Sequence, residues 1–332
     1  MVRDKKCIGV LTSGGDAPGM NAAIRAVVRT AITKDIIPVG VIRGYNGLLE
    51  KNITRMDARS VSGIIQRGDT ILKTARCKEF YEEKYREIAY QNAKELGLDG
   101  LVVIGGDGSY QGAGFLSRLG LPCIGIPGTI DNDIACTEYT IGFDTAMNTV
   151  IECVDKLDDT CKSHERCSVV EVMGRHAGHV ALNTGIATGA IGIITEEIPN
   201  SIEDIARHIF KAREIGKEHF VVIVSEGYGK PHEIAEKIEA MTGVESRATV
   251  LGHIQRGGAP TLKDRVVATQ ITVQILFHGQ CFFQIQIHDT VASLCNDPIS
   301  NALFKEFHSS VSHLYRGSGS GRSIGHEKGS GP

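Results

Sequence analysis

The chain repeats one pattern: a short run of β-branched and aliphatic residues, a turn rich in glycine or acidic residues, and then a stretch with apolar residues at helical spacing. Such runs predict strands at residues 7–12, 101–104, 123–126, 168–172 and 220–224. Helical spacing follows each turn, first over residues 21–33. Strands that alternate with helices form a mostly parallel sheet with helices on both faces, so the predicted fold class is α/β.

Three of the turns carry residues suited to phosphate chemistry, and ligands bind where the strands of such sheets end. Residues 12–21 open a helix, where backbone N–H groups and the helix dipole can receive an anion. Residues 105–109 add Asp107, a carboxylate able to hold Mg²⁺ beside phosphates. Asp131 and Asp133 suit a proton acceptor and a metal anchor acting through water. Taken singly, each loop can also be interpreted as an ordinary turn.

Two common nucleotide-binding motifs are absent from the sequence. Gly106 and Gly108 begin a Rossmann-like fingerprint, but Gly112 comes one place too late. Lys217 and Lys230 each follow a glycine, yet neither is followed by the Ser or Thr of a Walker A motif. An oxidoreductase on a dinucleotide-binding fold is therefore disfavoured, and any nucleotide is held by another design.

Basic residues favour a site for several phosphates. Five arginines lie in or beside loops that contain glycine, histidine or acidic residues: Arg76, Arg166, Arg175, Arg247 and Arg256. One such arginine is usually a solvated surface charge. Five of them indicate phosphate binding, because the guanidinium fork matches phosphate oxygens.

Composition and charge exclude other classes of protein. The 36 Lys and Arg against 39 Asp and Glu leave a net charge of −3, without the basic excess of a general nucleic-acid binder. No apolar run approaches the roughly 18 residues of a membrane span, and no cleavable signal peptide is expected. Nine cysteines without a C-x-x-C pair indicate reduced thiols in the cytoplasm. Cys161, His164 and Cys167 fit none of the usual zinc spacings.

In this order, the motifs of residues 6–270 resemble the bacterial-type ATP-dependent 6-phosphofructokinase family. The resemblance implies two doubly wound, Rossmann-like parallel-sheet domains. An ATP-binding domain would cover residues 1–142, completed by about 255–305, and a fructose 6-phosphate-binding domain would cover 143–254. It further implies a glycolytic kinase that phosphorylates fructose 6-phosphate at the 1-hydroxyl with ATP and Mg²⁺, as a cytoplasmic homotetramer.

The same resemblance assigns roles to individual residues. Asp131 would be the general base, with Arg175 and Thr129 as catalytic partners, and Asp107 and Asp133 would serve Mg²⁺, the latter through water. The residues at ATP-binding positions are Gly15, Arg76, Cys77, Gly106, Asp107, Gly108 and Ser109. The residues at substrate-binding positions are Thr129, Ile130, Asp131, Arg166, Met173, Gly174, Arg175, Glu226, Arg247, His253 and Arg256. Of these, Arg166 and Arg247 would reach the substrate from a neighbouring subunit.

Two glycine positions distinguish ATP from pyrophosphate as the phosphoryl donor. The branch of the family that uses pyrophosphate typically has a carboxylate at the place of Gly108 and a lysine at the place of Gly128. Both glycines leave room for an adenosyl group, so the sequence favours ATP. Pyrophosphate remains an alternative.

The sequence departs from the family in two places. Arg25, Arg29 and Lys217 fit its effector site, but the expected charged or phosphate-binding groups are replaced at Ala58, Asp158, Ile191, Ile215 and Glu218. Residues after 270 do not match the family's closing helices and strands, and residues 306–332 are expected to be a disordered or foreign tail. A catalytically dead or misfolded remnant that still binds nucleotide is therefore the alternative from a different functional class.

Overall fold

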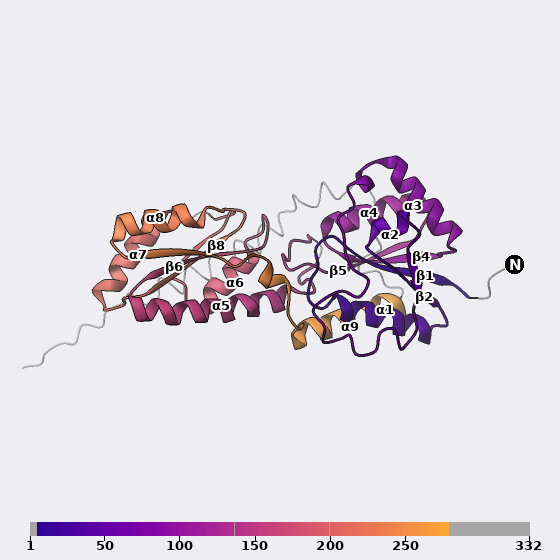
Figure 1. Ribbon diagram of the computed structural model, residues 1–332, viewed down its shortest axis with the longest axis horizontal. Helices are drawn as coiled ribbons and strands as arrows, with labels where there is room; N and C mark the ends of the chain where they lie inside the picture. Colours follow the sequence, from indigo (N-terminus) through magenta and orange to yellow (C-terminus); the bar gives the residue numbers. More distant parts are fainter. Residues whose placement is uncertain (1–4, 136, 199, 279–332) are drawn as a thin grey trace, which may run out of the picture. The chain divides into compact units, whose positions relative to one another are not determined.

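Two β-sheets organise the part of the chain that the computed structural model describes, residues 5–135, 137–198 and 200–278 (Figure 1). All of these residues belong to one compact unit, Met1–Gln286. The strand order is β3-β2-β1-β4-β5 in the first sheet and β7-β8-β6-β9 in the second. The predicted class, two parallel-sheet α/β halves, is confirmed.

The first sheet is parallel except for its edge strand β3, which runs antiparallel to β2. Its strands are β1 (Cys7–Ser13), β2 (Ile37–Val41), β3 (Ile53–Arg55), β4 (Gly100–Gly105) and β5 (Cys123–Pro127). Its helices are α1 (Met20–Thr33), α2 (Tyr45–Leu49), α3 (Glu83–Glu95) and α4 (Asp107–Arg118), with a 3₁₀ turn η1 (Glu79–Tyr81). Helix α9 (Leu262–His278) returns from the far end of the described chain and packs beside α1.

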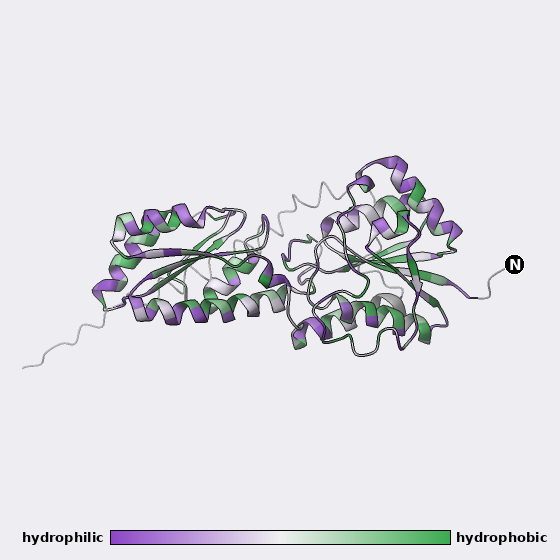
Figure 2. Cartoon of the chain, viewed as in Figure 1, coloured by the Kyte–Doolittle hydropathy of each residue, from purple (hydrophilic) through white to green (hydrophobic). Residues whose placement is uncertain are grey.

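Both faces of the sheet are buried at strands β1, β4 and β5, which explains why these strands are mostly apolar rather than alternating. Val10 faces the core beneath α1 and α9, whereas its neighbour Leu11 faces the core beneath α3 and α4. The hydrophobic strands are visible in green between the helices of Figure 2. Side-chain alternation therefore builds two cores from one sheet.

The second sheet is wholly parallel in the described residues. Its strands are β6 (Cys167–Val172), β7 (Gly192–Ile194), β8 (Phe220–Ser225) and β9 (Ser246–Val250). Its helices are α5 (Phe143–His164), α6 (His179–Ala187), α7 (Ile202–Glu214) and α8 (Pro231–Thr242), with a 3₁₀ turn η2 (Gly252–Arg256) after β9. Val169 packs toward α7 and α8, and Val170 packs toward α5 and α6.

All five strands expected from the sequence are present, and the structure corrects one boundary. Helix α4 begins at Asp107, inside the turn expected at residues 105–109, so residues 107–109 form its first turn and not a loop. Strands β2, β3, β7 and β9 were not predicted as strands. Helix α9 extends past residue 270, after which the sequence did not match the family's closing helices and strands.

The predicted tail at 306–332 and most of the segment after 270 lie outside the described residues.

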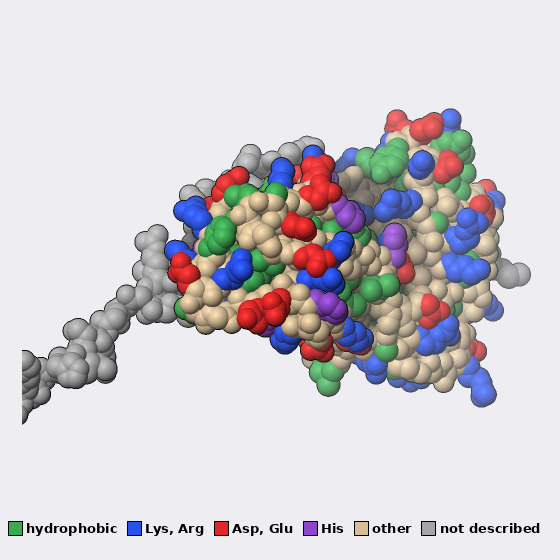
Figure 3. Space-filling view, turned by 60° about the vertical axis from the view of Figure 1, so that its left-hand side comes forward, with side chains coloured by type: hydrophobic (Ala, Val, Ile, Leu, Met, Phe, Trp, Pro, Cys, Tyr) green, Lys and Arg blue, Asp and Glu red, His purple; other side chains and the backbone are tan. Residues whose placement is uncertain are grey.

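Within the described residues, no helix is both long enough and apolar enough to span a membrane. The molecular face in Figure 3 carries acidic and basic side chains interspersed, without a continuous basic surface.

Candidate active site

Three predicted loops leave the first sheet side by side. In the parallel register, Ser13 of β1 lies opposite Gly105 of β4, and Gly105 lies opposite Pro127 of β5. The three strands therefore end at the same level, and their loops meet above the same edge. This is where a doubly wound sheet binds ligands.

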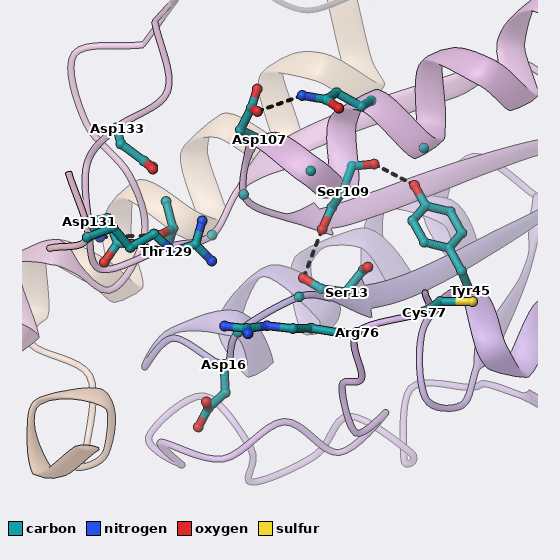
Figure 4. A pocket seen from close by; sticks show the side chains of 18 of the residues that line it. Ser13, Asp16, Tyr45, Arg76, Cys77, Asp107, Ser109, Thr129, Asp131 and Asp133 are labelled. Carbon is teal, nitrogen blue, oxygen red and sulfur yellow. Dashed lines mark hydrogen bonds and ion pairs between the residues drawn. The ribbon is translucent and has the colours of Figure 1, made fainter. Parts of the chain in front are cut away.

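The loops line a cavity of about 590 Å³, a volume typical of small-molecule sites (Figure 4). Most of the residues singled out in the sequence line it: Gly15, Arg76, Cys77, Gly106, Asp107, Gly108, Ser109, Thr129, Ile130, Asp131, Asp133, Met173, Arg175, Glu226 and Arg256. They come from segments far apart in the chain, as the ion pair between Asp16 and Arg256, 240 positions apart, illustrates. Their assigned roles remain predictions.

The first turn of α4 forms one wall of the cavity. The first amides of a helix have no partner inside the helix, so this turn offers N–H donors and a positive dipole end to an anion. The Ser109 hydroxyl donates to the Ser13 carbonyl at 3.0 Å, and the Tyr45 hydroxyl donates to the Ser109 carbonyl at 2.5 Å. The helix end is thus fastened to β1 on one side and to α2 on the other.

Two glycines of this helix meet different surroundings, and we expect opposite effects from alanine at each. A Cβ at Gly108 would meet nothing within 4 Å, whereas one at Gly112 would lie 2.8 Å from the Tyr45 ring. That ring stacks on Phe80 at 4.2 Å and cannot easily give way. Thermal unfolding should show Gly108→Ala stabilised by up to about 1 kcal/mol and Gly112→Ala destabilised by about 1–3 kcal/mol. Equal effects of the two substitutions would contradict this account.

The Asp131 carboxylate occupies the loop after β5 and is almost fully buried, with 6% of the residue exposed. Burial raises the pKa of this carboxyl, and the neighbouring Asp133 raises it further, while Arg175 opposes both. The Arg175 Nε lies 3.3 Å from Asp131 Oδ2. A buried carboxylate with a raised pKa, facing a cavity beside one arginine, is the setting of a general base.

The backbone of Arg175 fixes the position of this residue beside Asp131. The residue lies in the left-handed region, with φ of 51°, and its N–H donates to Glu226 Oε1 at 2.8 Å. Glu226 directly follows β8, whereas Met173 and Arg175 follow β6. The second sheet therefore contributes the ends of two adjacent strands to the cavity.

The carboxylates in the cavity fit Mg²⁺ that arrives with a phosphate ligand. Asp107 and Asp133 both line the cavity and both are exposed. No cluster of three or more His, Cys, Asp or Glu residues able to hold a metal occurs in the described residues. Mg²⁺ usually takes only one or two protein carboxylates and completes its shell with phosphates and water, so this donor set suits it. Cys161, His164 and Cys167 belong to no such cluster in the part of the chain that the structure describes.

An aromatic wall lines part of the cavity and was missed by the sequence analysis. Tyr45, Phe80, Tyr81 and Phe115 line it, and the Arg86 guanidinium lies 3.9 Å from the Phe115 ring centre. Phe80 and Tyr81 closely follow Arg76 in the chain, which was the available signal. Flat aromatic surfaces next to cations suit a ring system such as a nucleobase.

Some predicted residues lie away from the cavity. Those in the described chain that do not line it are Arg25, Arg29, Arg166, Gly174, Lys217, Arg247 and His253. Gly174 lies between two residues that do line it, and His253 is exposed on η2. The structure therefore does not bring the whole predicted substrate set together within one chain.

Arg166 and Arg247 share a carboxylate at the other end of the second sheet. Arg166 directly precedes β6, and Arg247 is the second residue of β9, where it pairs with Ser168. Both arginines therefore lie at the amino ends of their strands, whereas the cavity lies at the carboxyl ends of the strands. Glu245 Oε2 accepts from Arg166 Nε at 2.8 Å, and its Oε1 accepts from Arg247 Nη2 at 2.6 Å. The hydrogen bond from Arg166, and after it the one from Arg247, holds the pKa of the Glu245 carboxyl below its usual range.

The predicted effector residues are also separate from the cavity. Arg25 and Arg29 lie one turn apart on α1, and burial, followed by the charge of Arg29, lowers the pKa of Arg25. Lys217 follows α7. Asp158, one of the departures from the family's effector site, has its charge partly balanced by Lys162 at 2.7 Å.

Comparison with known proteins identifies relatives along most of the chain. The family model for phosphofructokinase matches residues 7–278, close to the boundary of 6–270 indicated by the motifs. An ATP-dependent 6-phosphofructokinase of Clostridium botulinum strain Hall is 55% identical over 278 residues, which cover 83% of this chain and 87% of the relative. One from strain Alaska E43 is 51% identical over 305 residues, covering 91% and 95%.

Solved structures share the fold. Phosphofructokinase from Saccharomyces cerevisiae superposes with a TM-score of 0.78 at 37% identity, covering 85% of this chain and 42% of that one. The Pichia pastoris enzyme in the T-state gives 0.79 at 39% identity, covering 83% and 32%. The present chain therefore spans less than half the length of these two yeast chains. A pyrophosphate-dependent phosphofructokinase from Marinobacter aquaeolei, at 23% identity and a TM-score of 0.70, shows the fold alone.

Proposed function

Because the chain belongs to the phosphofructokinase family, we propose that it transfers the γ-phosphoryl group of ATP to the 1-hydroxyl of fructose 6-phosphate. The products are fructose 1,6-bisphosphate and ADP, and the reaction is a step of glycolysis. The observation that carries the proposal is Asp131, a buried carboxylate with a raised pKa in a cavity that also exposes a helix N-terminus and three arginines.

Each residue around Asp131 has a part in the proposed reaction. Asp131 accepts the proton of the sugar hydroxyl as the oxygen attacks phosphorus, and ADP leaves with the electrons of the broken P–O bond. Arg175, 3.3 Å from Asp131, orients the base and faces the developing charge. Thr129, whose hydroxyl accepts from the Asp131 backbone N–H at 3.2 Å, shapes the loop.

The nucleotide is assigned to the side of the cavity formed by the first sheet. Gly15 and the turn from Gly106 to Ser109 lie beside the phosphates. Arg76 and Cys77 also line this side, and they come just before Phe80 and Tyr81 of the aromatic wall in the chain. Asp107 and Asp133 would hold Mg²⁺, which would neutralise phosphate charge when bound. Residues 1–142 then act as the ATP-binding domain and residues 143–254 as the sugar-phosphate domain.

The sugar phosphate is assigned to the loops of the second sheet. Met173, Gly174, Arg175, Glu226, His253 and Arg256 contact it from the same chain. Arg166 and Arg247 lie at the opposite end of the sheet, so they serve a neighbouring chain's cavity in a homotetramer. The proposed location is the cytoplasm, because glycolysis takes place in the cytoplasm.

A coupled assay for fructose 1,6-bisphosphate, run with ATP and separately with pyrophosphate, tests the proposal. We expect turnover with ATP and none with pyrophosphate, because Gly108 has open space on its side-chain face. Turnover with pyrophosphate alone would reassign the donor. No turnover with either donor, from a chain that sediments as aggregates, would support the catalytically dead remnant instead.

A further inference from the structure

Asp264, in the first turn of α9, is a fully buried carboxylate that the proposed reaction does not use. It accepts hydrogen bonds from the Tyr139 hydroxyl at 2.6 Å, the Gly142 N–H at 2.9 Å and the Thr145 N–H at 2.9 Å. The Thr145 hydroxyl donates to it as well. Within the described residues it makes no ion pair, so neutral donors alone compensate its buried charge.

The carboxylate stabilises the N-terminus of a helix other than its own. Gly142 is the N-cap of α5, with φ of 104°, and Thr145 lies in the first turn of that helix. The first amides of a helix need outside acceptors, and a negative charge there also interacts favourably with the helix dipole. No side chain of α5 or its N-cap residue caps this end. Asp264 therefore does from α9 what a capping residue usually does locally.

The capped segment is joined directly to the loop that carries Asp131. The Ile141 N–H donates to the Pro127 carbonyl at 2.8 Å, and Gly128 and Ile141 form a β-bridge. The buried Thr140 hydroxyl donates to the Thr129 carbonyl at 2.7 Å. The two arms of the loop, residues 127–129 and 139–142, are thus hydrogen-bonded together, with Asp131 between them.

We propose that Asp264 is a positioning residue for the candidate base, holding the returning arm of the loop, and through it Asp131, in the reactive position. The expected effect on kcat rests on the proposed function. The expected effect on the position and hydrogen exchange of the loop rests on the hydrogen bonds alone. Misplacement of a reacting group by about 1 Å can cost on the order of 100-fold in rate, so a remote buried anchor can matter as much as a contact with substrate.

The test is Asp264→Asn, which keeps the size of the side chain but offers one acceptor oxygen in place of two. We expect kcat to fall by about 10- to 100-fold, with the KM for fructose 6-phosphate changed by less than about threefold. Amide hydrogen exchange in residues 127–145 should become faster. Thr272→Val is the matched control, because its buried hydroxyl donates only to Ala268 within α9. It should change neither kcat nor exchange in that segment.

A second variant separates positioning from general loss of stability. Tyr139→Phe removes one donor to Asp264 and also the acceptor of the Asp144 N–H, and it should lower kcat less than Asp264→Asn. In the double variant, the tyrosine change should cost less than it does alone, because the part of its effect that passes through Asp264 is already gone. Full additivity of the two changes would overturn the proposal. So would an Asp264→Asn enzyme that keeps wild-type kcat, or one that loses kcat without faster exchange in residues 127–145.

Hydrogen exchange also keeps this proposal apart from the proposed function. If the wild-type chain turns over neither donor, the assigned reaction fails. Faster exchange of residues 127–145 in Asp264→Asn but not in Thr272→Val would still establish the anchor. Unchanged exchange in an active enzyme would remove the anchor and leave the reaction standing.

Discussion

Replacing Asp131 with asparagine is expected to lower kcat by about 10²- to 10⁴-fold while leaving the KM for fructose 6-phosphate little changed. The amide fills the same volume but cannot take the hydroxyl proton, so the loss falls on the transition state. Steady-state kinetics in the coupled assay measure both constants. Glu138→Gln is the matched control, since that exposed carboxylate lies on the same loop outside the cavity. A variant that keeps most of its turnover would remove Asp131 from the role of base.

The raised pKa of Asp131 also predicts a trade between activity and stability. A carboxyl whose pKa is raised on folding binds its proton more tightly in the native state than in the unfolded chain. Its contribution to stability is therefore present at low pH and is lost as the pH rises through the folded-state pKa. At neutral pH, Asp131→Asn should unfold at a higher temperature than wild type, and the difference should shrink in acid. The acid limb of the wild-type kcat/KM profile, which reports groups of the free enzyme, should lie above the pH at which an ordinary aspartate titrates.

Replacing Arg247 with alanine is expected to raise the KM for fructose 6-phosphate by about 10- to 100-fold, with a smaller change in kcat. A charge-assisted contact with a phosphate that does not react is made equally in the ground state and the transition state. Arg207→Ala is the control, because that exposed arginine pairs with Asp204 on α7. An unchanged KM would exclude Arg247 from the substrate site.

The placement of Arg247 makes a stronger test possible. Arg247 shares Glu245 with Arg166 at the amino end of the second sheet, away from the cavity of its own chain. If it serves a neighbouring subunit, mixing inactive Asp131→Asn chains with Arg247→Ala chains should create some sites with both wild-type residues. The KM of those sites should equal that of wild type. Hybrid oligomers without such recovered activity would count against a shared site.

Local sequence was sufficient to predict the parts of the site that lie at strand ends. An apolar run followed by glycine and aspartate places Asp107 and Asp131 at the carboxyl ends of β4 and β5, because parallel strands bring their ends to one edge. The family resemblance supplied the roles. Both depend on residues close together in the chain, which is where periodicity and turn chemistry carry information.

Short strands and helix starts were less predictable. Strand β7 has three residues, and only the first of the five residues of β9 is buried, so both contain too few buried apolar residues to establish a period. Their pairing with β8 and β6 supplies the hydrogen bonds that make them strands. Helix α4 begins earlier than expected because Ser13 and Tyr45, distant in the chain, hold Ser109 in its first turn.

The sequence by itself therefore determined the α/β class, the order of the loops and the identity of the candidate base. Only the tertiary structure decided which charges neutralise one another: Arg175 beside Asp131, Glu245 between two arginines, and Asp264 beneath the N-terminus of α5. The physical reason is range. Periodicity and turns act over a few residues, whereas an ion pair or a buried hydrogen bond depends on the distance between side chains that the folded sheets bring together.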